Sequence, residues 1–105
     1  MERVAFRIRL KEGMKEEYKK RHDGIWPEMS AMLDEAGMKN YSIWLTDDNQ
    51  LFGYYELAVP REVRDMVLTE SEVNKRWNKH MDGLIDATFE TTGTFKDLEE
   101  MFYHK

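Results

Sequence analysis

Two hydrophobic patterns follow each other in the first third of the chain, one typical of a strand and one of a helix. Apolar residues occupy every second position of residues 4–10, alternating with arginine or alanine, which predicts a strand with one buried face. Over residues 14–36 the apolar positions recur in steps of three and four, which keeps them on one face of a helix. Because proline interrupts regular helices, we expect a break or kink between Asp23 and Pro27.

The rest of the chain predicts a hairpin, a second helical region and a last strand. Residues 40–45 and 51–57 are rich in aromatic and branched side chains, and the loop-forming residues between them predict an antiparallel pair. Pro60 opens a helical region that continues, after Thr69, in a second piece with its own apolar stripe. Residues 88–97 have loop composition, and residues 98–103 read as a short final strand.

The order strand, helix, strand, strand, helix, strand predicts an α+β fold of the ferredoxin-like βαββαβ type, with both helical regions on one face of an antiparallel sheet. At 105 residues we expect one domain, residues 1–105. On the other sheet face the alternation places three large aromatic residues beside arginines: Trp44, Phe52 and Tyr54. So large an apolar patch is typical of a subunit interface, and we expect a homodimer.

The amino-acid composition limits which binding partners and which cellular compartment we expect for the protein. The net charge of -5 argues against nucleic acid, whose binding proteins gather lysine and arginine on one face. No apolar run approaches the roughly 20 residues of a membrane-spanning helix, and the first ten residues lack the apolar centre of a signal peptide. We therefore expect a cytoplasmic protein that binds neither nucleic acid nor membranes and takes a small neutral ligand.

The sequence favours chemistry without a metal or a nucleotide cofactor. His22, His80 and His104 are scattered, with no His-Glu-x-x-His or other paired spacing, and the chain has no cysteine. The six glycines are dispersed, and no Gly-x-Gly phosphate loop is present. We expect no cofactor of either kind.

The side chains best suited to chemistry lie around the expected helix break. His22 lies on the apolar stripe one turn after Tyr18 and one turn before Trp26, and its ring titrates near neutral pH. A histidine on such a stripe is more often a packed ring than a catalyst, but irregular backbone beside it favours a pocket. Trp77, on the last helical stripe, and Tyr41, on the helix-facing side of its strand, are each either core residues or ligand contacts.

Three segments and the end of the chain carry a recognisable pattern: Tyr18-x-x-Arg21-His22-x-x-Ile25-Trp26-Pro27-Glu28, Gly37-x-x-Asn40-Tyr41-Ser42-Ile43, Arg76-Trp77 and Met101-Phe102-Tyr103. The sequence thereby resembles the L-rhamnose mutarotase family over nearly its whole length. The resemblance implies a dimeric α+β barrel, His22 as proton donor, and Tyr18, Tyr41 and Trp77 as sugar-binding residues. The family pattern has a second tryptophan where this chain has Asn78, so Asn78 either alters the sugar preference or points to solvent.

A mutarotase interconverts the α and β anomers of a pyranose by opening the ring and closing it again. His22 is then the acid toward the ring oxygen, with Tyr18 orienting the ring or the sugar. The base is a tyrosine, a water or His22 itself in a later step. Two other functions remain open, since a fold does not fix a function: a cofactor-free monooxygenase of the same dimeric barrel class, and a non-catalytic small-molecule binding domain.

Overall fold

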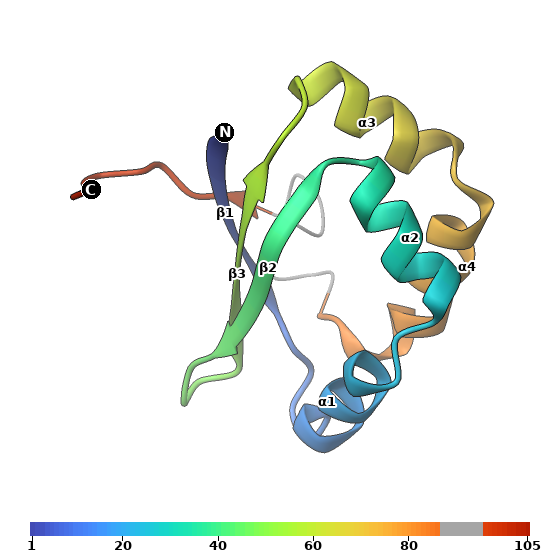
Figure 1. The fold of residues 1–105 in the computed structure, drawn as a ribbon. Coiled ribbons are helices and arrows are strands. Elements are labelled where there is room, and N and C mark those ends of the chain that lie inside the picture. The colour runs from blue at the N-terminus through green and yellow to red at the C-terminus, as the bar shows by residue number, and fades with distance from the viewer. Residues whose placement is uncertain (87–95) are drawn as a thin grey trace.

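The computed structural model describes residues 1–86 and 96–105 (Figure 1). The elements follow in the order β1 (Glu2–Arg9), α1 (Lys15–Asp23), α2 (Pro27–Glu35), β2 (Met38–Leu45), β3 (Gln50–Leu57), α3 (Arg61–Glu70), α4 (Glu72–Met81), a 3₁₀ turn η1 (Asp82–Leu84) and β4 (Lys96–Asp97). Each predicted helical region is therefore divided into two helices.

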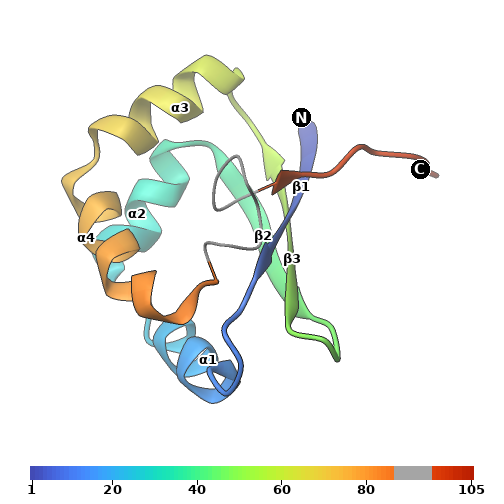
Figure 2. The same cartoon turned by 180° about the vertical axis from the view of Figure 1, so that it is seen from behind.

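The strands form one sheet in the order β2-β3-β1-β4, and every pairing is antiparallel. Figures 1 and 2 show the helices on one side of this sheet and the C-terminal end of the chain on the other. This layered α+β arrangement with its central β1 and β3 is ferredoxin-like, so the predicted fold class is confirmed. That the chain is a single domain stays a prediction.

The first helical region breaks where the sequence predicts it. The backbone N–H of Gly24 donates to the carbonyl of Lys20 at 3.1 Å and closes α1. Trp26 has extended backbone angles, as expected for a residue before proline, and Pro27 starts α2 at a position where its missing N–H costs nothing. The break separates α1 from α2, and His22 and Asp23 at the end of α1 border the cavity described below.

The final strand differs from the prediction. β4 is Lys96–Asp97 and pairs with Phe6 and Arg7 of β1, whereas residues 98–103 were expected to form the strand. After Leu98 donates to the carbonyl of Ala5 the chain leaves the sheet. Met101 and Phe102 are 84% and 81% exposed, because no described part of this chain covers them. Most of the expected loop at residues 88–97 lies outside the described residues, and its last two residues form β4.

The core lies between the sheet and the helices and follows the predicted alternation. Its buried residues are Val4, Phe6, Ile8, Leu10, Met29, Met32, Ala36, Leu51, Tyr55, Leu57, Trp77, Met81 and Leu84. Phe6 pairs with Gly53 across β1 and β3, and a Cβ at residue 53 would lie only 2.1 Å from the Phe6 ring. The absent side chain of Gly53 therefore makes the space that Phe6 fills.

This close approach predicts that Gly53→Ala destabilises the protein. Overpacking of a well-filled core costs about 1–3 kcal/mol or more, because the Phe6 ring or the backbone has to move. Urea denaturation would measure the loss. Gly83→Ala is the matched control, since no atom lies within 4 Å of a Cβ built there, and Phe6→Leu added to Gly53→Ala should recover part of the loss. Equal unfolding midpoints for Gly53→Ala and Gly83→Ala would contradict this account.

Candidate active site

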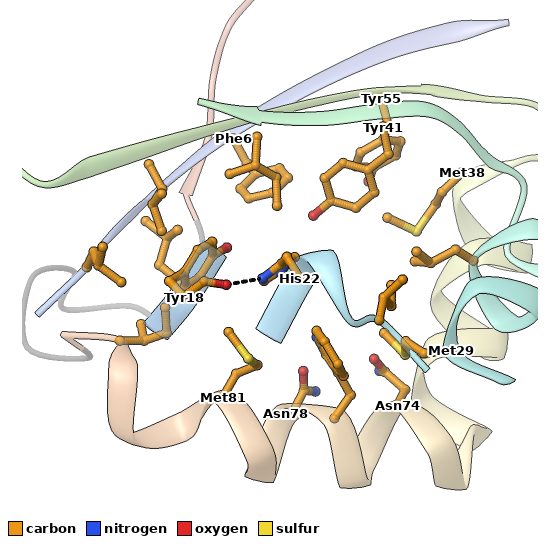
Figure 3. Close-up of a pocket in the computed structure, with 18 of the residues that line it drawn as sticks. Phe6, Tyr18, His22, Met29, Met38, Tyr41, Tyr55, Asn74, Asn78 and Met81 are labelled. Carbon is orange, nitrogen blue, oxygen red and sulfur yellow. Dashed lines mark hydrogen bonds between the residues drawn. The ribbon is translucent and has the colours of Figure 1, made fainter. Parts of the chain in front are cut away.

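A cavity of about 1130 Å³ lies between the sheet and the helices. β1, β2 and β3 supply one wall, which includes Phe6, Tyr41 and Tyr55, and α1, α2, α3 and α4 supply the other (Figure 3). The lining is largely apolar and aromatic, with a few polar groups among it, which is the usual composition of a small-molecule site. The size leaves room for a ligand as large as a monosaccharide.

His22 lies at the end of α1 and borders this cavity. Its Nδ1 is 3.2 Å from the carbonyl oxygen of Tyr18, one helical turn earlier (Figure 3). Because a carbonyl oxygen only accepts, Nδ1 carries the proton in this hydrogen bond. In the neutral ring Nε2 is then the unprotonated nitrogen, and it can accept a proton from a ligand.

Burial is the main influence on the charge of His22. The half-buried ring loses hydration when it is charged, which lowers the pKa of His22 below its ordinary value of 6.5. The hydrogen bond to the Tyr18 carbonyl and the nearby charge of Asp23 act in the opposite direction and are weaker. The ring is therefore mostly neutral at pH 7.

Tyr18 stacks on His22, with ring centroids 4.3 Å apart and planes 25° apart. Tyr41 reaches the same cavity from β2, where it meets Phe6 edge-on at 6.1 Å and Tyr55 at 5.4 Å. Burial raises the pKa of the Tyr18 and Tyr41 hydroxyls well above the ordinary value of 10. Both tyrosines are therefore neutral and suited to hydrogen bonding with hydroxyl groups of a ligand.

Trp77 of α4 packs against His22 of α1. It is only 6% exposed, and its ring meets those of His22 and Trp26 at right angles, with centroids 5.4 Å and 5.1 Å away. The sequence left Trp77 as either a core residue or a ligand contact. It is a buried member of the core, and it also borders the cavity, so a contact with a ligand stays a prediction.

Asn78 follows Trp77 on α4 and is exposed, yet it also lines the cavity. In Figure 3 its side chain extends from α4 toward the cavity. Asn78 is therefore solvent-exposed and at the cavity wall, and its effect on sugar preference stays a prediction. It can exchange hydrogen bonds with a ligand that reaches the opening.

Arg64, Tyr55 and Asn74 are among the polar lining residues that the sequence analysis did not single out. Arg64 donates through Nη1 to the hydroxyl of Tyr55 at 2.8 Å, and Asn74 donates to the carbonyl of Leu68 at 3.0 Å. Of these residues, only Asn74 could have been found from the sequence, because it lies one helical turn before Asn78 and therefore on the same helix face. Arg64 and Tyr55 come from different elements, so only the fold brings them together.

In residues 1–86 and 96–105 no three histidine, aspartate or glutamate side chains gather in a way that could hold a metal ion. The expectation that no cofactor is needed stays a prediction. Across the same part of the chain, no helix is both long and apolar enough to span a bilayer.

Several solved structures share the fold at low sequence identity. A protein from Nitrosomonas europaea that carries the provisional name antibiotic biosynthesis monooxygenase superposes with a TM-score of 0.62 at 12% identity, over 91% of this chain and 84% of that one. A protein from Mycobacterium tuberculosis gives 0.61 at 12% identity over 98% and 97%. At this identity the likeness concerns the fold alone.

Closer similarities run along the whole sequence. Residues 3–104 match the sequence profile of the L-rhamnose mutarotase family. L-rhamnose mutarotases from Agrobacterium fabrum and Listeria monocytogenes are each 40% identical over 104 residues, which cover 98% of this chain and 95% and 98% of theirs. The crystal structure of an L-rhamnose mutarotase from Formosa agariphila superposes with a TM-score of 0.84 at 31% identity over all of both chains. The chain therefore belongs to the L-rhamnose mutarotase family.

Proposed function

We propose that this protein is an isomerase that interconverts the α and β anomers of L-rhamnose or a closely related pyranose. Membership of the family supports this reaction, and one observation supports its assignment to the cavity beside His22. His22 borders the cavity with Nδ1–H directed to the Tyr18 carbonyl, so that its other nitrogen remains for proton transfer. Among the side chains that line the cavity, an imidazole is the group whose ordinary pKa lies nearest neutrality.

The proton transfers can be written with His22 alone. Neutral Nε2 accepts the proton of the anomeric hydroxyl while the bond between C1 and the ring oxygen breaks. The bonding electron pair goes to the ring oxygen, which takes the proton back from the imidazolium, and C1 becomes an aldehyde. Rotation about the C1–C2 bond and the reverse transfers close the ring with the other configuration.

This order refines the assignment of His22 as an acid toward the ring oxygen. The lowered pKa favours a neutral ring at the start, so His22 acts first as a base and then as the acid. The raised pKa of Tyr18 and Tyr41 argues against a tyrosinate base. We assign these two hydroxyls to holding sugar oxygens, and Trp77 and Asn78 to contacts with the sugar ring.

A site of this kind can supply the rate acceleration that a mutarotase needs. Mutarotation already proceeds in water, and positioned acid–base catalysis typically adds about 10²- to 10⁴-fold, equivalent to roughly 3–5 kcal/mol. No metal, nucleotide or covalent intermediate is needed for a reaction that only moves protons. A monooxygenase would consume oxygen and change the mass of its substrate, and a simple binding domain would leave anomer exchange at its uncatalysed rate.

The homodimer expected from the sequence is part of this proposal. Trp44 is 70% exposed, and its cross-strand partner is Phe52, on the sheet face opposite the helices. An uncovered aromatic patch of this kind suits a second copy of the chain, related by a twofold axis. The cytoplasmic location, and the absence of nucleic-acid and membrane partners, stay predictions.

For catalysis we predict that His22→Ala abolishes the faster anomer exchange on L-rhamnose while the protein stays folded, because a proton carrier at the cavity wall is lost rather than a large piece of core. Saturation-transfer NMR would measure the exchange, and circular dichroism the fold. His80→Ala is the matched control, since His80 contacts Trp26 and Trp77 in the same aromatic cluster but is exposed. Full activity in His22→Ala, or its unfolding, would favour a merely packed histidine.

For specificity we predict that Asn78→Trp changes the ranking of L-rhamnose, L-fucose, L-mannose and L-lyxose. An indole covers the apolar face of a pyranose, whereas an amide offers hydrogen bonds and leaves space. Losing or gaining one such contact shifts discrimination by about 1–3 kcal/mol. Anomer-exchange rates on the four sugars would be compared before and after the substitution. An unchanged rate and an unchanged ranking would remove Asn78 from the sugar site.

For assembly we predict that replacing both Trp44 and Tyr54 by glutamate yields a monomer or insoluble protein, because like charges would face each other across the proposed twofold interface. Light scattering at micromolar concentration would give the mass of the native chain and of the variant. A native chain that is already monomeric under these conditions would contradict the proposed dimer.

A further inference from the structure

The helix that carries His22 has little apolar surface of its own to hold it in place. No residue of α1 is buried, and most of its side chains are charged. Tyr18 and His22 are its aromatic residues, and both are only partly buried where they border the cavity. Because packing alone fixes such a polar helix weakly, its position depends on specific contacts with neighbouring elements. Figures 1 and 2 show α1 at one end of the molecule, next to the end of α4.

Arg21 makes such a contact with α4. Its Nη1 donates to the backbone carbonyl of His80, in the last turn of α4. Its Nε donates to Oε1 of Glu17 at 2.8 Å, one turn earlier in α1. The planar guanidinium is therefore held by two acceptors at once, one on each helix. The dipole of α4 also favours a cation at this end of the helix.

The same two helices meet where the proposed proton transfers take place. The ring of His22, the residue after Arg21, meets the ring of Trp77 on α4 with centroids 5.4 Å apart. Trp77 lies one turn before His80, whose carbonyl accepts from Arg21. The hydrogen bond of Arg21 therefore fixes α1 on α4 close to the contact between His22 and the cavity wall. Arg21 is not among the described residues that line the cavity.

We propose that Arg21 is a positioning residue for the reaction: its hydrogen bond to the His80 carbonyl holds α1 on α4 and so keeps His22 within reach of the sugar. The inference rests on the proposed function, because His22 is assigned the proton transfers there. Arg21 touches no substrate. It acts on the place of the His22 ring and not on its tautomer, since the bond from Nδ1 to the Tyr18 carbonyl lies within α1 and moves with it.

The first test removes the guanidinium. Arg21→Met keeps a long side chain that cannot donate to the His80 carbonyl. It should lower kcat/KM for L-rhamnose anomer exchange about 10- to 100-fold, as expected when a catalytic group is misplaced by about 1 Å. Lys20→Met is the matched control, because it removes the same charge from the same helix, and Lys20 is exposed and not among the described lining residues. Equal kcat/KM for the two variants would overturn the proposal.

Arg21→Lys gives a graded comparison and covers the case that Arg21→Met does not fold. An ammonium group can donate to one of the two acceptors but lacks the fixed fork that serves both. Its kcat/KM should therefore fall about 3- to 10-fold, less than in Arg21→Met. Urea denaturation would show which variants fold. Wild-type kcat/KM in Arg21→Lys together with an unfolded Arg21→Met would assign Arg21 to stability alone and overturn the proposal.

NMR of the His22 ring separates a displaced histidine from a protein that is merely less stable. Because the rings meet, the ring current of Trp77 shifts the carbon-bound ring protons of His22. In folded Arg21→Met we predict that these shifts move toward those of an exposed histidine and that the pKa of His22 rises toward 6.5, since burial lowers it. The pKa in Lys20→Met gives the part due to charge alone. Unchanged ring shifts in folded Arg21→Met would overturn the proposal.

The two readouts also distinguish the failure of this inference from the failure of the proposed reaction. If the wild type exchanges no anomers, the proposed function is refuted, and displaced ring shifts in Arg21→Met still support a role of Arg21 in holding the ring. If the wild type exchanges anomers and Arg21→Met changes neither the rate nor the ring shifts of His22, the positioning role alone is refuted.

Discussion

The site depends on one hydrogen bond between a side chain and the backbone of its own helix. Nδ1–H of His22 donates to the Tyr18 carbonyl, one helical turn earlier in α1. The bond fixes the tautomer and the direction of the ring, and the stacked Tyr18 ring covers one of its faces. A half-buried imidazole held in this way is neutral at pH 7, and its second nitrogen remains basic. The proposed proton transfer needs both properties.

The rest of the fold keeps that nitrogen beside a cavity rather than inside a packed core. Pro27 ends the continuity of the helix, so the end of α1 is separated from α2, while Trp77 meets both Trp26 and His22 and closes the space from α4. From the sheet, Gly53 makes room for Phe6, and the Phe6 ring supports Tyr41. Phe6, Tyr41, His22 and Trp77 thereby line the same cavity.

The sequence predicts the helices and strands that follow from the periodicity of buried residues or from proline. It does not predict features that depend on contacts between residues far apart in the chain. The alternation in β1 and β3 and the break before Pro27 follow from the residues themselves. Residues 98–103 were expected to form the last strand, but β4 is Lys96–Asp97, and the chain leaves the sheet after Leu98 donates to the carbonyl of Ala5. Asn40 has a φ of 51°, in the left-handed region, and the sequence does not reveal this, because asparagine is also common in other conformations. Arg64 lines the cavity and donates to Tyr55, 9 residues away on another element, so only the fold brings these two residues together.

Nitrogen-15 NMR of the histidine rings, recorded against pH alongside the rate of L-rhamnose anomer exchange, tests the central claim most directly. The account predicts that neutral His22 carries its proton on Nδ1 and that its pKa lies below 6.5. Since protonation removes the basic Nε2, kcat/KM should be constant above pH 7 and fall on acidification with that same pKa. A proton on Nε2 in the neutral ring, or a pKa above 6.5, or an exchange rate that does not follow the titration of His22, would contradict it.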